Sequence, residues 1–264
     1  MAVVANWHAR PDLPGLRADD VHLLLSAGDN VPKLWPADGP PGRPFVELIR
    51  RYRELFATTL FMPISGNHDR ETRPRGERFP AEPVYDLEAA AFRAVFALPG
   101  EETRWHLDVP GFDVRFVAAD LHHTSDVGTT WQSCAPFGAD APQLREFQER
   151  VEGAPGRFVV SLYNEKHSTV RGLAGGAWRR ALVKGTLAVS GFGYFAERAE
   201  PGGFPCYTTS LGGRGAKYPD PESAFFASED NYLLLTFRRG ASELVAELKA
   251  LDGRSLDRRA WRGR

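Results

Sequence analysis

The residues best suited to chemistry are those of the stretch Gly-Asn-His-Asp at 66–69, which follows the apolar run at 57–62. An amide oxygen, an imidazole and a carboxylate side by side at the end of a strand can bind a metal ion or move a proton. His68 and Asp69 are therefore a candidate acid–base pair. The open question is whether the rest of the chain supplies further ligands.

Two more polar groups follow apolar runs nearer the N-terminus. Asp29 and Asn30 follow the run at 21–27, and Asn6 and His8 follow the run at 2–5. Strand ends are where open α/β sheets place their sites, so we expect these groups to converge with 66–69. As the alternative, Asp29 is a plain turn residue that bonds to local backbone, and His8 is an ordinary polar residue at a strand end.

The order of these motifs resembles that of the calcineurin-like metallophosphoesterases, including relatives of purple acid phosphatase. The resemblance extends along the whole chain, through "VAADLHHTS", "APQLREFQERV", "SGFGYFAER", "CYTTSLGGRGA" and "NYLLLTF". It implies an α/β fold, a four-layer α-β-β-α sandwich of mixed sheets with flanking helices, in a single domain over 1–264.

The resemblance also implies a two-metal site in which a bridging water attacks a phosphoester. In that site Asp29 is the bridging carboxylate, Asn67 offers its amide oxygen to the second metal, and His8 binds the first. His68, paired with Asp69, bonds the phosphate or protonates the leaving group without being a ligand.

Several expected ligands are replaced in this chain. Asn6 stands where the family has an aspartate, which leaves a weak or lost metal ligand. Tyr163 and Asn164 stand where a ligand histidine is expected, and His167 lies three residues beyond Asn164.

The last motif, Gly-His-x-His in the family, is Gly-Phe-Gly-Tyr here. Phe192 cannot bind a metal, whereas Tyr194 could do so as a phenolate on a trivalent ion. With fewer nitrogen and anionic donors, divalent binding is weaker. We therefore expect a degraded two-metal site that holds no metal or one weakly bound ion of Fe, Mn or Zn.

Other residues are candidate replacements. His122 and His123 follow "VAAD" as substitute ligands or as parts of a surface loop, and His167 with Glu165 belongs to an exposed loop or a rebuilt site. The predicted pocket residues are Asn30, Tyr163, Asn164, His167, Phe192, Tyr194, His122 and His123.

The elements that must position these residues follow from hydrophobic periodicity. Short apolar runs predict strands at 2–5, 21–27, 58–64, 114–119, 157–163, 186–191, 206–211, 231–237 and 243–251. Apolar stripes at helical spacing predict helices at 44–57, 86–100 and 140–153, the last with Asp140 as N-cap. The stretches 30–44, 70–84, 121–139 and 164–180 are predicted long loops.

Composition limits the partners. The chain has 264 residues, 42% of them hydrophobic and 25% charged, with a net charge of −1. We expect no nucleic-acid or membrane partner and a small-molecule ligand, with the oligomeric state open. We find no signal peptide and only two cysteines, and therefore expect a cytoplasmic protein. The basic C-terminal "RSLDRRAWRGR" is predicted to be a solvated tail.

Three functions remain open at this point. The favoured one is a divergent metallophosphoesterase-fold protein with a degraded metal site. Such a protein is non-catalytic, or it uses the inherited site for one-metal or metal-free acid–base chemistry on a small ligand. The second is an active metal-dependent phosphoester hydrolase with substitute ligands. The third is an interaction module that keeps the fold as a scaffold.

Overall fold

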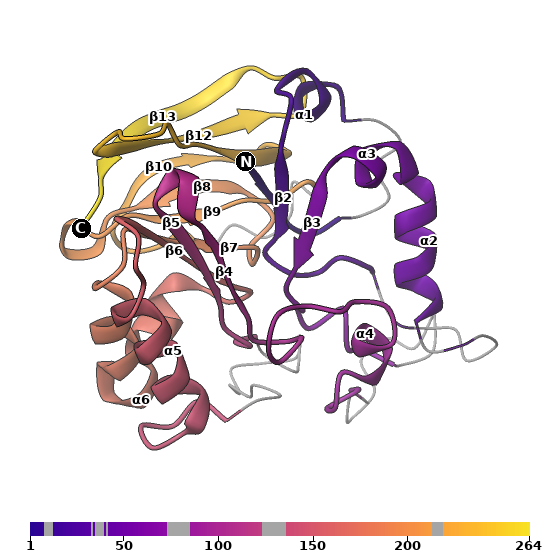
Figure 1. Ribbon diagram of the computed structural model, residues 1–264, viewed down its shortest axis with the longest axis horizontal. Coiled ribbons are helices and arrows are strands. Elements are labelled where there is room, and N and C mark those ends of the chain that lie inside the picture. The colour runs from indigo at the N-terminus through magenta and orange to yellow at the C-terminus, as the bar shows by residue number, and fades with distance from the viewer. Residues whose placement is uncertain are drawn as a thin grey trace.

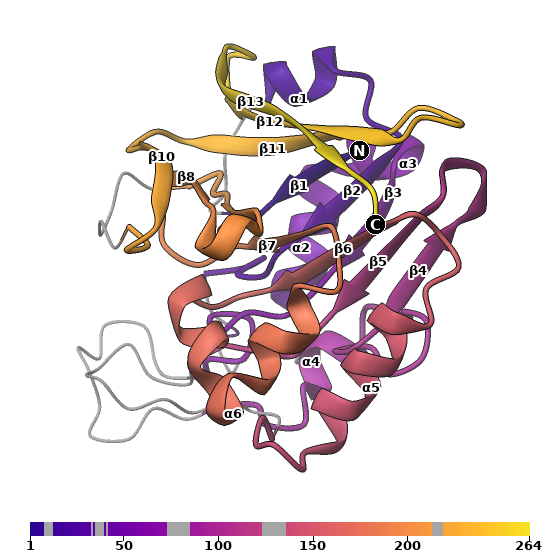
Figure 2. The ribbon, with the colours of Figure 1, turned by 90° about the vertical axis from the view of Figure 1, so that its left-hand side faces the viewer.

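The computed structural model describes residues 1–7, 13–32, 34, 40, 42–72, 85–122, 136–212 and 219–264. Two mixed β-sheets pack face to face, and helices cover their outer faces (Figures 1 and 2). This is the α-β-β-α sandwich expected from the sequence.

The first sheet carries two of the predicted motifs. Its strand order is β13-β12-β11-β1-β2-β3. The strands are β1 (Ala2–Val4), β2 (Leu23–Ser26), β3 (Leu60–Pro63), β11 (Asn231–Thr236), β12 (Glu243–Ala250) and β13 (Ser255–Arg262). β1, β2 and β3 are parallel, so their carboxyl ends lie at one edge of the sheet.

The second sheet has the order β10-β8-β9-β7-β6-β5-β4. Its strands are β4 (His106–Val109), β5 (Val114–Ala118), β6 (Phe158–Tyr163), β7 (Leu187–Ser190), β8 (Ala196–Ala199), β9 (Cys206–Thr208) and β10 (Ser223–Ala227). β5, β6 and β7 are parallel to one another. β4, β8 and β10 lie outside the predicted strand runs.

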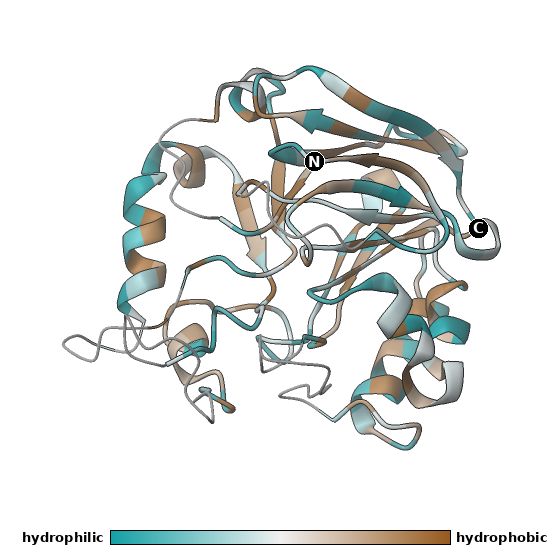
Figure 3. Ribbon diagram, turned by 180° about the vertical axis from the view of Figure 1, so that it is seen from behind, coloured by the Kyte–Doolittle hydropathy of each residue, from teal (hydrophilic) through white to brown (hydrophobic). Residues whose placement is uncertain are grey.

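The central strands are buried on both faces, which explains their continuous apolar runs. In β2, Leu23 and Leu25 face the core between the sheets, whereas Leu24 packs in the cluster beneath α2. Phe116 and Val160 fill the inter-sheet core from the second sheet. Brown hydrophobic segments accordingly run through the strands in Figure 3.

Helices α1 (Pro14–Ala18), α2 (Arg43–Arg51), α3 (Arg53–Thr58) and α4 (Ala90–Arg93) belong to the side of the first sheet. The predicted continuous helix at 44–57 was wrong, because the chain breaks at Tyr52 with φ −110°. At this break the rings of Tyr52 and Phe56 pack on Trp7, with centroids 5.0 and 5.6 Å away.

The predicted helix at 86–100 was too long. Ala89 has a left-handed φ of 51°, so α4 begins only at Ala90. Asp86 Oδ2 accepts a hydrogen bond from Ala91 N at 2.9 Å, which favours a turn before the helix. Leu87, predicted to be part of the apolar stripe, is 61% exposed.

Helices α5 (Pro142–Glu152) and α6 (His167–Leu182) cover the second sheet. The prediction for α5 is confirmed, with Leu144, Phe147 and Val151 buried, but its N-cap is Ala141 and not Asp140. The predicted loop at 164–180 was wrong, because it contains α6. Positive φ values at Ala174, Gly175 and Gly176 break this helix internally. We did not predict the helix, because glycines are typical of loops.

The C-terminal segment was also predicted wrongly, because it is the edge strand β13 and not a solvated tail. Its Trp261 donates an Nε1 hydrogen bond of 2.6 Å to the hydroxyl of Tyr207, which joins the two sheets. Two 3₁₀ turns, Pro110–Phe112 and Pro201–Gly203, complete the described elements. Within the described residues, no helix has the length and apolar character needed to cross a membrane.

Candidate functional site

The turn after β2 holds Asp29 at the corner where the strand ends meet. Gly28 and Asp29 have left-handed φ values of 93° and 55°. Asp29 is 3% exposed, and its Oδ1 accepts a hydrogen bond of 3.1 Å from the backbone N of His68. A Cβ built at Gly66 would lie 2.2 Å from Asp29 Oδ1, so only glycine lets the two turns approach this closely.

Asn6 ties the end of β1 to two other strand ends. Its backbone N donates to Gly28 O at 3.1 Å, and its φ is 50°. Its side-chain Nδ2 donates to Gly191 O and, at 3.1 Å, to Ser210 Oγ. The structure therefore brings the first, second and last predicted motifs together.

Asn164, directly after β6, reaches the same turn from the second sheet. Its Nδ2 donates to Ala27 O at 2.8 Å. A Cβ at Gly28 would lie 2.6 Å from this Nδ2. The residue that replaces an expected histidine thus stands beside Asp29, as the motif order predicted.

His68 lies between a carboxylate and a hydroxyl. Its Nδ1 is 3.2 Å from Glu71 Oε2, and its Nε2 is 3.3 Å from the hydroxyl of Tyr194. Because an ionised carboxylate only accepts hydrogen bonds, Nδ1 carries the proton in the neutral ring. Nε2 is then the acceptor, toward which Tyr194 donates.

The predicted pairing of His68 with Asp69 was wrong. The Asp69 Oδ2 accepts hydrogen bonds of 2.8 Å from both Asn30 Nδ2 and Gly66 N, and its Oδ1 accepts one of 3.0 Å from Val31 N. Burial, and then the nearby charge of Asp29, raise the pKa of Asp69 to about 6. Asp69 therefore organises the turns, and Glu71 is the partner of His68.

Sequence analysis missed Glu71, because it falls in a stretch that we predicted as a long loop. The signal that could have found it is its position three residues after His68, since a turn brings such residues together. The Glu71 side chain is fully buried, whereas that of His68 is 17% exposed. The imidazole thus keeps a small exposed surface, whereas its carboxylate partner has none.

The replaced last motif lies next to His68. Tyr194 has a left-handed φ of 56°, which aims its ring at the site. Phe192 is half-buried, and the Lys166 ammonium lies 5.7 Å from the centre of its ring. Phe192 and Lys166 therefore add an apolar surface and a positive charge near the strand ends.

Tyr163 and His167 form a separate buried pair on the helix side of the second sheet. The Tyr163 hydroxyl is 2.6 Å from His167 Nδ1, and His167 Nε2 is 3.0 Å from Tyr207 O. Because a carbonyl only accepts, Nε2 carries the proton of His167 and Nδ1 accepts from Tyr163. Both ring nitrogens are thus used in the core.

The pKa values of this pair agree with a structural role. Burial lowers the pKa of His167 to about 4 and raises that of the Tyr163 hydroxyl well above its usual value. A buried phenol of this kind does not form the phenolate that metal binding requires. The prediction that these two residues belong to the pocket finds no support in their contacts.

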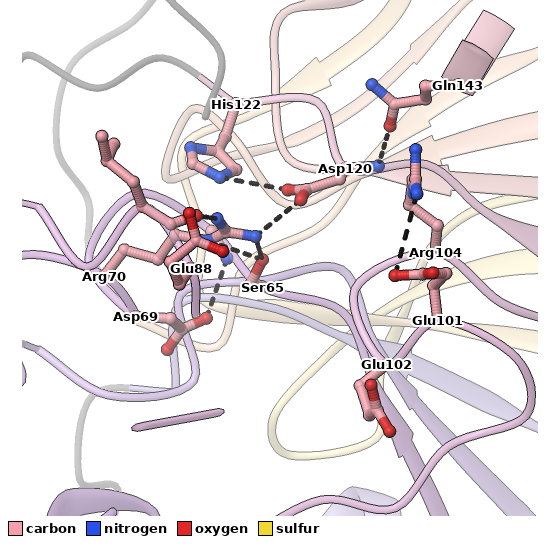
Figure 4. A network of polar contacts seen from close by, with 12 residues as sticks. Ser65, Asp69, Arg70, Glu88, Glu101, Glu102, Arg104, Asp120, His122 and Gln143 are labelled. Atoms are coloured by element: carbon pink, nitrogen blue, oxygen red, sulfur yellow. Dashed lines mark hydrogen bonds and ion pairs between the residues drawn. The ribbon is translucent and has the colours of Figure 1, made fainter. Parts of the chain in front are cut away.

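His122 belongs to a buried ionic network (Figure 4). Arg70 Nη2 is 2.6 Å from Asp120 Oδ2 and 3.1 Å from Ser65 Oγ, and His122 Nε2 is 3.2 Å from Asp120 Oδ1. Burial opposes ionisation of Asp120, but Arg70 and His122 outweigh it and hold the pKa of Asp120 below its usual value. His122 therefore stabilises the end of β5 against the 66–70 turn.

The remaining predicted residues are Asn67, which is buried in the turn, and His8 and His123, which lie outside the described residues. Within the described residues, the buried amide oxygens of Asn6, Asn30 and Asn164 accept no hydrogen bond. Of these, Asn164 Oδ1 lies on the same side of Gly66 as Asp29 Oδ1.

The donors among the described residues do not by themselves fit a two-metal centre of the expected kind. The imidazoles of His68, His122 and His167 have the carboxylate, hydroxyl or carbonyl partners described above. Nowhere in the described ranges do three or more His, Cys, Asp and Glu side chains gather as metal ligands would. The oxygens that remain are poor substitutes for the nitrogen donors that transition metals prefer.

Comparison with solved structures identifies the fold. GAP50, the anchor in the inner membrane complex of Plasmodium, matches with a TM-score of 0.63 at 11% identity, over 100% of this chain and 88% of that one. A predicted phosphoesterase of Streptococcus pneumoniae matches with a TM-score of 0.37 at 10% identity, over 98% and 95% of the two chains. A 5′-nucleotidase precursor of Thermus thermophilus matches with a TM-score of 0.43 at 11% identity, over 98% and 53%.

The fold is that of the calcineurin-like metallophosphoesterases. No family model matches the sequence, and no curated protein matches it. At identities this low the likeness defines the metallophosphoesterase fold alone, and activity must be argued from the site.

The glycine contact can be tested by adding one methyl group. Gly66→Ala would place a Cβ 2.2 Å from Asp29 Oδ1 and 2.6 Å from Asp29 N. We expect this overpacking to lower the free energy of unfolding by about 1–3 kcal/mol in urea denaturation. Gly172→Ala is the matched control, since its Cβ would meet nothing within 4 Å. Equal stability of both variants would contradict the close packing of the two turns.

His167 should make stability depend on pH. Its pKa is lowered from 6.5 to about 4 in the folded protein, so the unfolded chain binds the proton more readily in that range. Stability from this group is present above pH 6.5 and is lost as the pH falls toward 4, by about 3 kcal/mol in all. The difference in free energy of unfolding between wild type and His167→Gln should shrink over this range. A constant difference would show that His167 is not buried as neutral imidazole.

Proposed function

We propose that this protein uses the metallophosphoesterase fold for acid–base chemistry at His68 on a small ligand, without the two-metal centre. The observation that carries the proposal is the sequence of contacts from Glu71 through His68 to Tyr194, at 3.2 and 3.3 Å. A carboxylate that fixes the tautomer of an imidazole beside a hydroxyl is a common arrangement for proton transfer.

The chemistry follows from the positions of the protons. Nε2 of neutral His68 accepts the proton of a water or ligand hydroxyl that takes the place of the Tyr194 hydroxyl, as the oxygen of that group attacks the carbon or phosphorus of an ester. The buried carboxylate of Glu71 stabilises the imidazolium that results. The proton then passes from Nε2 to the leaving-group oxygen as the ester bond breaks. Because nothing in this cycle needs a metal-bound water, it suits the donor set of the site.

The residues next to Tyr194 support a ligand that is partly apolar and carries negative charge. Phe192 lies two residues before Tyr194 in the chain and supplies an aromatic surface, and the Lys166 ammonium lies over the Phe192 ring. Small-molecule sites commonly combine apolar walls with a few fixed polar groups. A flat anionic compound meets these requirements better than free phosphate.

A second candidate is an interaction module. It is supported by the likeness to GAP50, a protein of the same fold that is described as an anchor. In that case the Glu71, His68 and Tyr194 contacts are structural. The active metal-dependent hydrolase receives less support, because it requires nitrogen donors and those of His68, His122 and His167 have other partners.

The acid–base role predicts a graded loss of activity. We would assay chelator-treated protein against chromogenic phosphomonoesters, phosphodiesters and carboxylic esters. We expect metal-independent turnover that falls by roughly 10²–10⁴-fold in His68→Gln, because the proton acceptor is removed. Glu71→Gln and Tyr194→Phe should reduce it less. His22→Gln is the matched control, since His22 is an exposed histidine just before β2.

Two results would redirect the proposal. Turnover that needs added Mn²⁺ or Zn²⁺ and disappears in Asp29→Ala would favour the metal-dependent hydrolase. No turnover in the wild type, with ligand binding equal in wild type and His68→Gln, would favour the interaction module.

The tautomer of His68 can be measured by NMR spectroscopy. Imidazole ¹⁵N chemical shifts at neutral pH should show the proton on Nδ1 of His68, because Glu71 accepts it. In Glu71→Gln this preference should weaken, since a neutral amide can donate as well as accept. A proton on Nε2 in the wild type would rule out His68 as the base toward Tyr194.

A further inference from the structure

The strand β13, at one end of the first sheet, has an edge that pairs with no other strand. It pairs with β12 alone, and among the described residues no backbone group forms a hydrogen bond along its other side. Figure 1 shows β12 and β13 at the end of the molecule opposite α5 and α6. An unpaired edge presents backbone N–H and C=O groups that can take up a further strand.

The pairing with β12 fixes which backbone groups of β13 are already used. Just beyond the strand, Gly263 N donates to the carbonyl O of Ser242, the residue opposite it, at 2.9 Å. Leu244 is opposite Trp261 in the same register. Opposite residues of antiparallel strands alternate between hydrogen-bonded and non-bonded pairs, so Trp261 bonds to β12 as Gly263 does. Every second residue of β13 is thus engaged with β12.

The residues between them direct their backbone groups to the free edge. They are Arg258, Ala260 and Arg262, and all three are exposed. The side chains of Arg258 and Arg262 are 61% and 87% exposed. No proline interrupts the sequence from 255 to 264. This edge therefore offers hydrogen-bond donors and acceptors along its whole length.

Side chains on the inner face hold β13 in place. Trp261 Nε1 donates to the Tyr207 hydroxyl at 2.6 Å, and Arg198 Nε donates to Asp257 Oδ2 at 2.7 Å. Both contacts join β13 to the second sheet. An edge held in this way needs little ordering when another strand pairs with it, which lowers the entropic cost of binding.

The free edge is strongly basic. Together, β13 and the two residues after it contain four arginines and one acidic residue, Asp257, whose carboxylate is engaged on the inner face. On the outer face, Arg258 and Arg262 lie 3.8 and 3.6 Å from Glu247 and Glu243 of β12. Ion pairs this exposed are weak, so both guanidinium groups can also contact an acid across the free edge.

This charge disfavours a second copy of β13 as the added strand. An antiparallel pair centred on Ala260 would place Arg258 opposite Arg262. A pair centred on Arg258 or Arg259 would place that arginine opposite its own copy. Like charges directly opposite each other destabilise a sheet, whereas opposite charges stabilise it. The edge therefore opposes self-association and favours an acidic strand.

We propose that β13 binds an extended acidic segment of a partner protein by strand addition, in the antiparallel direction. The residues opposite Arg262 and Arg258 are then the first and fifth of the added strand, and they point to the same face as these arginines. Glu or Asp at both positions complements the edge. Main-chain hydrogen bonds supply affinity and the two acids supply specificity. The inference does not depend on the acid–base role of His68.

The test is fluorescence anisotropy of a labelled peptide whose central residues are Glu-Val-Thr-Glu-Glu, titrated with the full chain. We expect saturable binding that weakens between about 0.05 and 0.5 M NaCl, because salt screens exposed charges. N-methylation of the third residue, opposite Ala260, removes an N–H that faces β13 and should abolish binding. N-methylation of the second residue changes an N–H that faces away, so binding should be retained.

Two variants separate the edge from general charge. Ala260→Pro removes an outward N–H but no hydrogen bond to β12, so it should fold and bind about tenfold or more weakly. Arg258→Glu with Arg262→Glu should abolish binding of this peptide and create binding of one with lysines in place of the glutamates. This pair decides the test if Ala260→Pro does not fold. Arg50→Glu with Arg53→Glu, on exposed arginines of α2 and α3, is the matched control and should bind as wild type.

Three outcomes would overturn the proposal. The first is no binding at about 1 mM protein, the weak end of the affinity scale. The second is equal affinity for the two N-methylated peptides, which would reduce the attraction to charge alone, as for any polyanion. The third is a dimer of the free protein in analytical ultracentrifugation that Ala260→Pro abolishes, since a second copy would then occupy the edge.

Discussion

The close approach of four strand ends at three glycines is the constraint on which the site depends. A Cβ at Gly191 would lie 2.2 Å from Ala27 O, one at Gly66 would lie 2.2 Å from Asp29 Oδ1, and one at Gly28 would lie 2.6 Å from Asn164 Nδ2. These contacts join β2, β3, β6 and β7 across both sheets. Any side chain at the three positions would force the strand ends apart.

This packing decides what the replaced residues do. With the strand ends so close, Asn6 and Asn164 can use their amide nitrogens to hold backbone carbonyls of neighbouring turns. A neutral imidazole also carries a donor, but its second nitrogen is the atom that binds transition metals. The amide at 164 donates its hydrogen bond to Ala27 O and leaves an oxygen, not a nitrogen, as its free atom.

Much of the fold and the membership of this corner could be predicted from the sequence. Apolar runs at strand spacing located the buried strands, and the ordered Gly-containing motifs gave the meeting of Asn6, Asp29, Asn164, His68 and Tyr194. The hydrogen-bond partners of these side chains could not be predicted. Asp69 accepts hydrogen bonds from Asn30 and two backbone amides, and Glu71 is the carboxylate that contacts the His68 imidazole. Turn geometry and not sequence adjacency sets these distances. The break at Tyr52 and the glycine-interrupted α6 likewise depend on tertiary packing, which overrides local periodicity.

The position of His68 and the contacts of its ring are set by different residues. Among the described contacts, Asp29 accepts the backbone amide of His68 at 3.1 Å, whereas the imidazole extends to Glu71 and Tyr194. The 66–69 turn is therefore held in place without the use of either ring nitrogen. A carboxylate that orders one backbone amide can in this way serve the position of His68 while leaving its proton chemistry to Glu71.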